Sequence, residues 1–299
     1  MNDLKILGLD CGATEIKGVV TNERGIILDT ACFPSNLNKG IKGYLSSIQL
    51  TIKQLYMKNM DIALAGIASA GRINTQNALV EYATDNIPNY TGTNLRDVAG
   101  EVIQVPVYAE NDARAALMGE YWLGAAKDLN NVVMLTLGTG LGGANLVDGR
   151  IYSGHGFKAG EWGHVIIEQA GRQCTCGRKG CLEQYVSSGA VTLAASKAVG
   201  RSIMREEIFS LYKEGNREIN RVIEEFVGYL ALAIYNISVS LDPEAVIIGG
   251  GLSEYFDDFI SPLRNELEKY RVNMDIRKAV LLNRAGCVGA AKLAIDNLM

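Results

Sequence analysis

The sequence predicts an α/β protein with a duplicated architecture. An apolar run over residues 5–10 leads into a glycine loop, a second apolar run and a turn at residues 22–25. The same order returns from residue 131, where an apolar run, a glycine loop and a further strand lead to Asp148-Gly149. Asp-Gly between apolar runs favours a hairpin, because both central positions of that turn need positive φ. Helical patterns between and after these two units complete the α/β assignment.

Four helices follow from apolar spacing and from start and stop signals. Apolar residues recur at helical spacing over residues 39–60, which indicates a crossover helix after the first unit. The longest pattern covers residues 218–241 and stops before Pro243, which cannot continue a helix. Residues 111–127 begin with Asn and Asp, which favour helix starts. Residues 287–297 contain small side chains that permit close packing.

Residues 161–183 contain four candidate metal ligands, namely His164, Cys174, Cys176 and Cys181. One imidazole and three thiols form the ligand set of a closed tetrahedral zinc site. Because the chain shows no secretory signal, cysteines this close favour a metal over disulfides. Two glycines between the last two cysteines supply the freedom in φ that a knuckle around an ion needs.

Three glycine loops are suited to a nucleotide. Residues 10–17 follow a strand and offer backbone amides, a hydroxyl and a cation, and Asp10 can hold the water shell of Mg²⁺. Residues 138–143 hold four glycines and are followed by a strand, which excludes a Rossmann fingerprint. Residues 249–251 precede a helix start that favours an anion. The expected nucleotide ligands are Asp10, Gly12, Thr14, Lys17, Gly138, Thr139, Gly140, Gly142, Gly143, Gly249 and Gly250.

These motifs together resemble the ROK family of sugar kinases and sugar-responsive repressors. The resemblance is carried by E-x-G-H, nine residues and then C-x-C-G-x-x-G-C-x-E, with LGLDCGATEIKG, AENDARAALMGE, LGTGLGGA and VIIGGGLS around them. It covers nearly the whole chain. It implies two ribonuclease H-like domains of the actin/hexokinase type, with sugar and ATP in an interdomain cleft. Residue 4 already begins the first strand, so we expect the kinase branch rather than repressors with an N-terminal DNA-binding domain.

The resemblance also implies where the two domains divide. The N-terminal domain is expected to be discontinuous and to contain residues 1–115 plus 286–299. Residues 116–285 form the larger C-terminal domain with the zinc knuckle. Ala13 departs from the family pattern, which has two adjacent glycines in the first loop, and we expect it to narrow the approach of the β-phosphate.

The resemblance assigns Asp112 as the catalytic base. Phosphoryl transfer asks the protein chiefly to position groups and stabilise charge, with one base for the attacking hydroxyl. Read without the resemblance, Asp112 is equally well a helix cap. His164 is expected to hold zinc through one ring nitrogen and a sugar hydroxyl through the other. The expected substrate ligands are Gly71, Asn86, Asn111, Asp112, Glu161, His164 and Glu183.

We therefore expect an ATP-dependent hexose kinase that phosphorylates the 6-hydroxyl of glucose, with structural Zn²⁺ and with Mg²⁺ bound to ATP. The segment around Asn86 resembles a glucokinase pattern, whereas Gly71 and Thr84 resemble positions that meet the acetyl group in N-acetylmannosamine kinases. N-acetylmannosamine and N-acetylglucosamine are therefore the alternative substrates, and mannose, fructose and allose stay open. A sugar-sensing regulator without catalysis and a chaperone-like ATPase are the rival classes.

Composition limits the partners. A net charge of −4 disfavours a broad nucleic-acid surface, where binding depends on phosphate neutralisation. The sequence shows no apolar run of membrane-spanning length and no basic-then-apolar leader. We expect a cytoplasmic homodimer that binds hexose and ATP but neither nucleic acid nor membrane.

Overall fold

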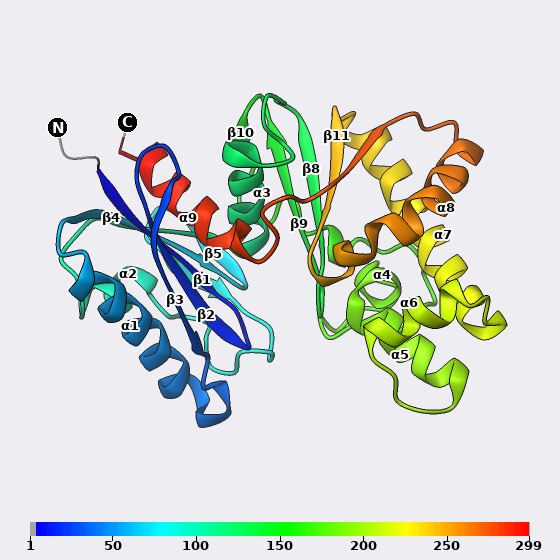
Figure 1. The fold of residues 1–299 in the computed structure, drawn as a ribbon, viewed down its shortest axis with the longest axis horizontal. Coiled ribbons are helices and arrows are strands. Elements are labelled where there is room, and N and C mark those ends of the chain that lie inside the picture. The colour runs from blue at the N-terminus through cyan, green and yellow to red at the C-terminus, as the bar shows by residue number, and fades with distance from the viewer. Residues whose placement is uncertain (1–3, 299) are drawn as a thin grey trace. The chain divides into compact units, whose positions relative to one another are not determined.

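The computed structural model describes residues 4–298 and divides the chain into two compact units (Figure 1). Unit 1 contains the chain through Asp128, the segment Ser153–Ala159 and the C-terminal part from Val280. Unit 2 contains Leu129–Tyr152 and Gly160–Ala279. Each unit has its own five-stranded sheet and its own helices.

The sheet of unit 1 has the strand order β3-β2-β1-β4-β7. β1 pairs antiparallel with β2 and parallel with β4, and β4 pairs parallel with β7. Its strands are β1 (Lys5–Cys11), β2 (Glu15–Thr21), β3 (Ile27–Pro34), β4 (Ile62–Ser69) and β7 (Val107–Asn111), and β5 (Arg72–Asn74) and β6 (Leu79–Tyr82) form a separate hairpin. The helices are η1 (Leu37–Lys39), α1 (Gly40–Lys58), α2 (Leu95–Gly100), α3 (Asp112–Leu123), η4 (Leu282–Arg284) and α9 (Ala285–Asp296).

Unit 2 repeats this topology in the order β10-β9-β8-β11-β12. β8 pairs antiparallel with β9 and parallel with β11, and β11 pairs parallel with β12. The strands are β8 (Val132–Leu137), β9 (Leu141–Val147), β10 (Arg150–Ile151), β11 (Ala245–Gly249) and β12 (Asp275–Lys278). The helices are η2 (Trp162–His164), α4 (Glu183–Val186), α5 (Ser188–Val199), α6 (Arg205–Lys213), α7 (Arg217–Leu241), η3 (Gly251–Tyr255) and α8 (Phe256–Lys269). The two sheets share one strand order and one set of directions, which confirms the predicted duplication.

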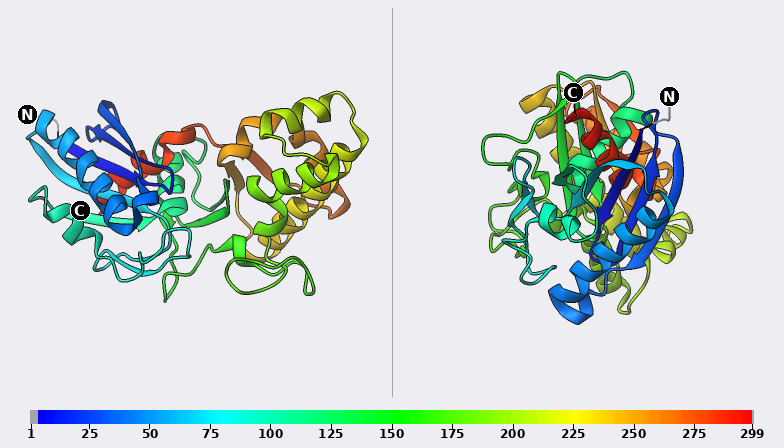
Figure 2. Two further views of the ribbon diagram at one scale, coloured as in Figure 1. Left: turned by 90° about the horizontal axis from the view of Figure 1, so that it is seen from below. Right: turned by 90° about the vertical axis from the view of Figure 1, so that its left-hand side faces the viewer.

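The first sheet is covered on both faces because its strand residues alternate. Leu7 and Leu9 belong to the apolar cluster that contains the buried face of α1. Ile6 belongs to a different cluster, with Ala291 and Ala294 of α9. The C-terminal helix thus returns to the N-terminal sheet, as Figures 1 and 2 show.

α9 lies so close to β1, β4 and α3 that several contacting residues must be glycine. A Cβ on Gly8 would lie 2.0 Å from the Cys287 carbonyl oxygen, and one on Gly66 would lie 1.8 Å from that of Ala290. A Cβ on Gly289 would lie 1.7 Å from the Ala115 carbonyl oxygen in α3. The close packing predicted for this helix is confirmed.

The observed unit boundary differs from the predicted boundary at residue 115, which falls inside α3. The whole of α3 stays in unit 1 because it packs against α9. Glu120, fully buried, also accepts hydrogen bonds from the backbone N–H groups of Val280 and Leu281 at 3.0 and 2.8 Å. The C-terminal segment therefore joins unit 1 at Val280, six residues before the predicted position.

α7 confirms the helix predicted at residues 218–241. Among the described residues it is the one helix long and apolar enough to cross a membrane by length and composition. Its apolar side chains, however, form the core of unit 2, where Val222, Phe226, Leu230 and Ile234 are buried. The helix is a core element of a globular unit.

We predict that Gly289→Ala lowers the free energy of unfolding by about 1–3 kcal/mol, the cost typical of overpacking. The added methyl group meets backbone atoms of α3, which cannot rotate away as a side chain can. Gly228→Ala is the matched control, because a Cβ at this position in α7 meets nothing within 4 Å. It should leave stability unchanged or raise it by about 0.5–1 kcal/mol. Chemical denaturation measures both variants, and equal effects would contradict the packing argument.

Candidate active site

Three parallel strands of unit 1 end side by side at one edge of the sheet. Cys11 of β1 is in register with Ser69 of β4, and Ser69 is in register with Asn111 of β7. Ligands of open α/β sheets bind outside the carboxyl ends of the strands. The predicted phosphate loop after β1 and the predicted base after β7 therefore share the edge where a ligand is expected.

Asn111 is the N-cap of α3 and orients Asp112. Its Oδ1 accepts hydrogen bonds from the backbone N–H groups of Ala113 and Arg114 at 3.0 and 3.2 Å. Its Nδ2 donates to Asp112 Oδ1 at 2.9 Å. The same Asp112 oxygen accepts the Ala113 N–H at 2.9 Å. The capping role that the sequence alone offered to Asp112 belongs to Asn111, so the Asp112 carboxylate stands oriented at the positive end of a helix.

The structure also brings Gly71 to this cluster. Asn111 Nδ2 donates to the Gly71 carbonyl oxygen at 3.1 Å. Gly71 has φ of 99°, and a Cβ there would lie 2.6 Å from the Tyr82 carbonyl oxygen, so only glycine fits. Asn86 is exposed on the loop after β6, which is anchored by the buried side chains of Ile87 and Tyr90.

Arg114 is a buried cation that the sequence reasoning missed. Its side chain is 2% exposed, and Nη1 lies 3.1 Å from Oε1 of Glu110, which stands four residues earlier in β7. Its Nη2 donates to the carbonyl oxygens of Phe157 and Ala159, both at 2.9 Å. Burial raises the pKa of Glu110, and the Arg114 guanidinium opposes that rise. Arg114 thus fixes Ser153–Ala159 to the helix that carries Asp112, and breaking such a buried pair is costly.

The first glycine loop is a tight turn. The Gly12 N–H donates to the Glu15 carbonyl oxygen at 3.1 Å, and the Ser35 hydroxyl donates to the Ala13 carbonyl oxygen at 2.6 Å. Ala13 is exposed and does not have positive φ, so alanine replaces the usual glycine there without backbone strain.

Asp10 lies opposite Lys17 across the hairpin and against the first turn of α9. A Cβ on Gly286 would lie 2.8 Å from its carboxylate. Burial raises the pKa of Asp10, and the charge of Lys17 lowers it in part. This surrounding fits a carboxylate that faces a hydrated Mg²⁺ ion.

The two other predicted nucleotide loops meet at one edge of the sheet in unit 2. The loop over residues 138–140 follows β8, and residues 249–251 follow the neighbouring β11. Gly250 has φ of 77°, and a Cβ there would lie 2.6 Å from the backbone of Leu137. Gly143 is required for a different reason, namely packing inside unit 2, because a Cβ there would lie 2.4 Å from the Gly160 carbonyl oxygen.

Arg205 is a second missed cation, at the start of α6. Its Nη1 lies 1.9 Å from where a Cβ on Gly251 would stand. The sequence offers no signal for this role, because Arg205 is far from the glycine loop along the chain. Its neighbours in sequence are the charged and apolar residues of an ordinary surface helix. A guanidinium beside a glycine loop suits a phosphate group.

Glu161, His164 and Glu183, the remaining predicted substrate ligands, lie in unit 2. Glu161 is exposed just before η2, and Trp162 anchors that helix through an Nε1 hydrogen bond of 2.7 Å to Asn145. Glu183 accepts the Leu141 N–H through Oε2 at 2.9 Å, and its Oε1 lies 3.9 Å from Cys174 Sγ. Glu183 therefore connects the second glycine loop with the cysteine cluster.

The four predicted metal ligands converge. The ligand atoms of His164, Cys174, Cys176 and Cys181 all lie within 4.8 Å of one another. Cys176 Sγ lies 3.6 Å from Cys181 Sγ, and Cys174 Sγ lies 3.8 Å from His164 Nδ1. A tetrahedral ion with zinc–sulfur bonds of about 2.3 Å needs edges of about 3.8 Å, so the residues fit Zn²⁺.

The knuckle glycines have the expected conformation. Gly177 and Gly180 have φ of 86° and 76°. A Cβ on Gly180 would lie 1.6 Å from the Glu168 carbonyl oxygen. Four protein ligands are the number that fills a tetrahedral ion completely, which is the arrangement of a structural zinc site.

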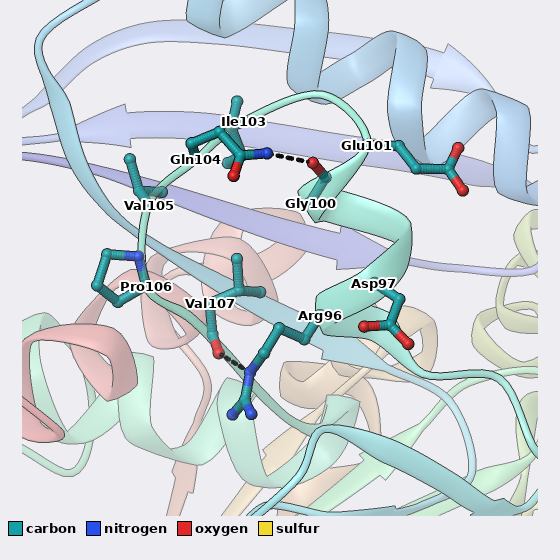
Figure 3. Close-up of a pocket in the computed structure, with 9 residues that line it drawn as sticks. All are labelled: Arg96, Asp97, Gly100, Glu101, Ile103, Gln104, Val105, Pro106 and Val107. Carbon is teal, nitrogen blue, oxygen red and sulfur yellow. Dashed lines mark hydrogen bonds between the residues drawn. The ribbon is translucent and has the colours of Figure 1, made fainter.

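A surface pocket lies at the opposite end of β7 from Asp112. It is lined by α2 and the chain that follows it, from Arg96 to Val107 (Figure 3). Arg96 Nε donates to the Val107 carbonyl oxygen at 3.3 Å, and Gln104 closes the far side through the Gly100 carbonyl oxygen. Because β7 separates this pocket from Asn111 by about four residue steps of 3.3 Å, it is not the candidate active site.

Comparison with known proteins decides the family. The model of the ROK family matches residues 6–297. The chain belongs to the ROK family. A glucokinase of Halalkalibacterium halodurans is 29% identical over 98% of this chain and 96% of that protein. An N-acetyl-D-glucosamine kinase of Haemophilus influenzae is 29% identical over 96% of this chain and 98% of that protein.

A solved structure shows the same fold. The ROK family glucokinase from Streptomyces griseus, in complex with glucose and AMPPNP, matches with a TM-score of 0.87 and 28% identity, over 98% of this chain and 99% of that chain. The two-domain fold of the actin/hexokinase type is confirmed, and so is the predicted class of ATP-dependent sugar kinase.

We predict that Cys176→Ser lowers the zinc content of the purified protein and its melting temperature together. Structural zinc contributes on the order of 10 kcal/mol to local folding, and a serine hydroxyl is a poor substitute for a thiolate. Cys32→Ser, on an exposed position of β3, is the control and should change neither quantity. Elemental analysis and thermal unfolding give the result. Full zinc content in Cys176→Ser would remove this cysteine from the ligand set.

Proposed function

We propose that this ROK kinase transfers the γ-phosphoryl group of ATP to the 6-hydroxyl of glucose. Asp112 takes the proton of the attacking hydroxyl. The observation that carries this proposal is the arrangement at the start of α3. Asn111 caps the helix and holds the Asp112 carboxylate in one orientation, so Asp112 is not needed as the cap. An oriented carboxylate at the carboxyl edge of the strands is the group that phosphoryl transfer requires of the protein.

The proposed acceptor ligands are Gly71, Asn86, Asn111 and Asp112 of unit 1 and Glu161, His164 and Glu183 of unit 2. His164 supports this proposal because its Nδ1 faces Cys174, which leaves Nε2 as the nitrogen for a sugar hydroxyl. Zinc, when bound, fixes the orientation of that ring. Glu183 already bonds the second glycine loop through Oε2, so its Oε1 is the oxygen proposed for the sugar.

The proposed nucleotide ligands are the three glycine loops. Backbone amides after β1 and the side chains of Thr14 and Lys17 face the phosphates, and Asp10 orders the water around Mg²⁺. Gly138 supports a ligand role for the second loop, because a Cβ there has no neighbour closer than 3.8 Å. We also propose that the enzyme is a cytoplasmic homodimer.

Glucose is preferred over the acetylated hexosamines in this proposal. Asn111 bonds the Gly71 carbonyl oxygen, and a Cβ on Gly71 would already lie 2.6 Å from the Tyr82 carbonyl oxygen, so an acetyl group has little room next to Gly71. The Haemophilus relative keeps an N-acetylhexosamine as the second candidate, since Thr84 lies on the same loop as Asn86.

We predict that the enzyme turns over glucose at a higher kcat/KM than N-acetylglucosamine or N-acetylmannosamine, by a factor of about 10–200, the range for one ill-fitting group in a pocket. ADP release, measured over a panel of hexoses and N-acetylhexosamines, tests this ratio. A ratio in favour of either acetylated sugar would contradict the choice of glucose and leave the kinase class intact. ATP hydrolysis that no sugar stimulates would contradict the proposed function itself.

A further inference from the structure

Two buried tyrosines stand beneath the carboxyl edge of the first sheet, and the proposed reaction does not use either of them. Tyr44 belongs to α1 and Tyr90 to the loop between β6 and α2, and both are fully buried. Their rings meet edge to face with centroids 5.3 Å apart. They approach the sheet from different segments and bond the ends of different strands.

The two hydroxyls have different partners. The Tyr44 hydroxyl donates to the Cys11 carbonyl oxygen at 2.7 Å, and it must be the donor because a carbonyl oxygen only accepts. The Tyr90 hydroxyl and the Ser69 hydroxyl lie 2.6 Å apart. Cys11 and Ser69 are neighbours in register at the ends of β1 and β4. The tyrosine pair therefore contacts the ends of two adjacent strands, β1 and β4, from the core side of the sheet.

The first of these contacts supports the phosphate loop. Cys11 lies between Asp10 and Gly12, so a hydrogen bond to its carbonyl oxygen fixes the peptide plane on which the loop begins. The outer side of the same loop is already fixed by Ser35. Tyr44 is thus the inner support of a turn that is held from both sides.

The second contact supports the loop over residues 83–94. Asn86 is exposed there, and the buried side chains that anchor this part of the loop are Ile87 and Tyr90. Tyr90 supplies the directional contact, since its hydroxyl reaches Ser69, the neighbour of Asn111 in the sheet. A phenylalanine at position 90 keeps the buried ring that anchors the loop and removes only the hydrogen bond to Ser69 that orients it.

The pair lies within electrostatic reach of the candidate base. Burial is the main cause that raises the pKa of both hydroxyls, and the charge of Asp112 adds a smaller rise to each. Both hydroxyls therefore stay protonated, and each takes part in a hydrogen bond. An unpaired hydroxyl or carbonyl at such a buried place is unfavourable, so each bond constrains its loop.

We propose that Tyr44 and Tyr90 are a pair of positioning residues with separate targets: Tyr44 sets the phosphate loop after β1, and Tyr90 sets the acceptor loop that carries Asn86. The assignment of the two loops to nucleotide and sugar rests on the proposed function. Neither tyrosine touches a reacting atom. The pair explains why two polar aromatic side chains occupy a core position that two phenylalanines would fill.

The two variants Tyr44→Phe and Tyr90→Phe test the proposal, and each serves as the control of the other. Both remove one buried hydroxyl from the same ring pair, so a merely structural role moves the two Michaelis constants alike. Tyr90→Phe should raise KM for the sugar about fivefold and change KM for ATP less than about twofold, as expected for one typical hydrogen bond. Tyr44→Phe should show the reverse pattern, also by about fivefold.

Tyr152→Phe is the outer control, because Tyr152 is 53% exposed and is none of the proposed sugar or nucleotide ligands. It should leave both constants unchanged. Parallel changes of both constants in each variant, or no change beyond that of Tyr152→Phe, overturn the proposal.

Amide hydrogen exchange without any ligand separates this proposal from the proposed function. Tyr90→Phe should speed exchange in residues 83–94 and Tyr44→Phe in residues 10–15, whether or not the protein phosphorylates a sugar. If the wild-type protein phosphorylates no sugar, the proposed function fails, and this loop-specific exchange still supports the positioning pair. Exchange that rises equally in both loops in both variants overturns the pair even in an active sugar kinase.

Discussion

The hydrogen bonds of the Asn111 side chain are the interaction on which the candidate site depends. Asn111 ends β7, caps α3, holds the Asp112 carboxylate and binds the Gly71 carbonyl oxygen, all through one amide group. A side chain that both accepts and donates is needed, because the helix start offers N–H groups while Asp112 and Gly71 offer oxygens. Below this junction, Tyr44 and Tyr90 support the neighbouring strand ends. The loops at the carboxyl edge of the first sheet are therefore held by Asn111 at the end of β7 and by the two tyrosines in the core.

Features with short-range causes could be predicted from the sequence. The duplicated strand and hairpin order follows from apolar runs and from Asp148-Gly149, whose φ angles of 50° and 72° are both positive. The convergence of His164, Cys174, Cys176 and Cys181 could be predicted because the chemistry and spacing of one short segment favour a shared ion. The long helix α7 and its end before Pro243 follow from apolar spacing and a stop signal. The family resemblance supplied the two-domain fold and the return of the C-terminal segment to the N-terminal domain, which local patterns do not contain.

Features that depend on contacts distant in sequence could not be predicted. Arg114 has the i,i+4 spacing of a surface ion pair with Glu110, and only the fold shows that the pair is buried and binds two carbonyl oxygens. Glu183 was expected only as a substrate ligand, whereas the structure also connects its carboxylate to the second glycine loop through the Leu141 N–H. The unit boundary at residue 115 missed the packing of α3 on α9, because glycine and alanine contacts between helices leave no periodic signal. In each case the partner lies dozens of residues away.

The central claim is that Asp112 acts as the base and that Asn111 caps the helix, and Asp112→Asn tests it most directly. Because Asn111 keeps α3 capped, the variant should fold and bind the sugar normally, while single-turnover phosphoryl transfer falls by about 10² to 10⁴, the usual contribution of a positioned base. Asp85→Asn, an exposed carboxylate on the acceptor loop, is the matched control and should transfer at the wild-type rate. Rapid-quench measurement of sugar phosphate, alongside a sugar titration, gives both quantities. A transfer rate above about a third of the wild-type rate in Asp112→Asn, far outside that range, would contradict the account.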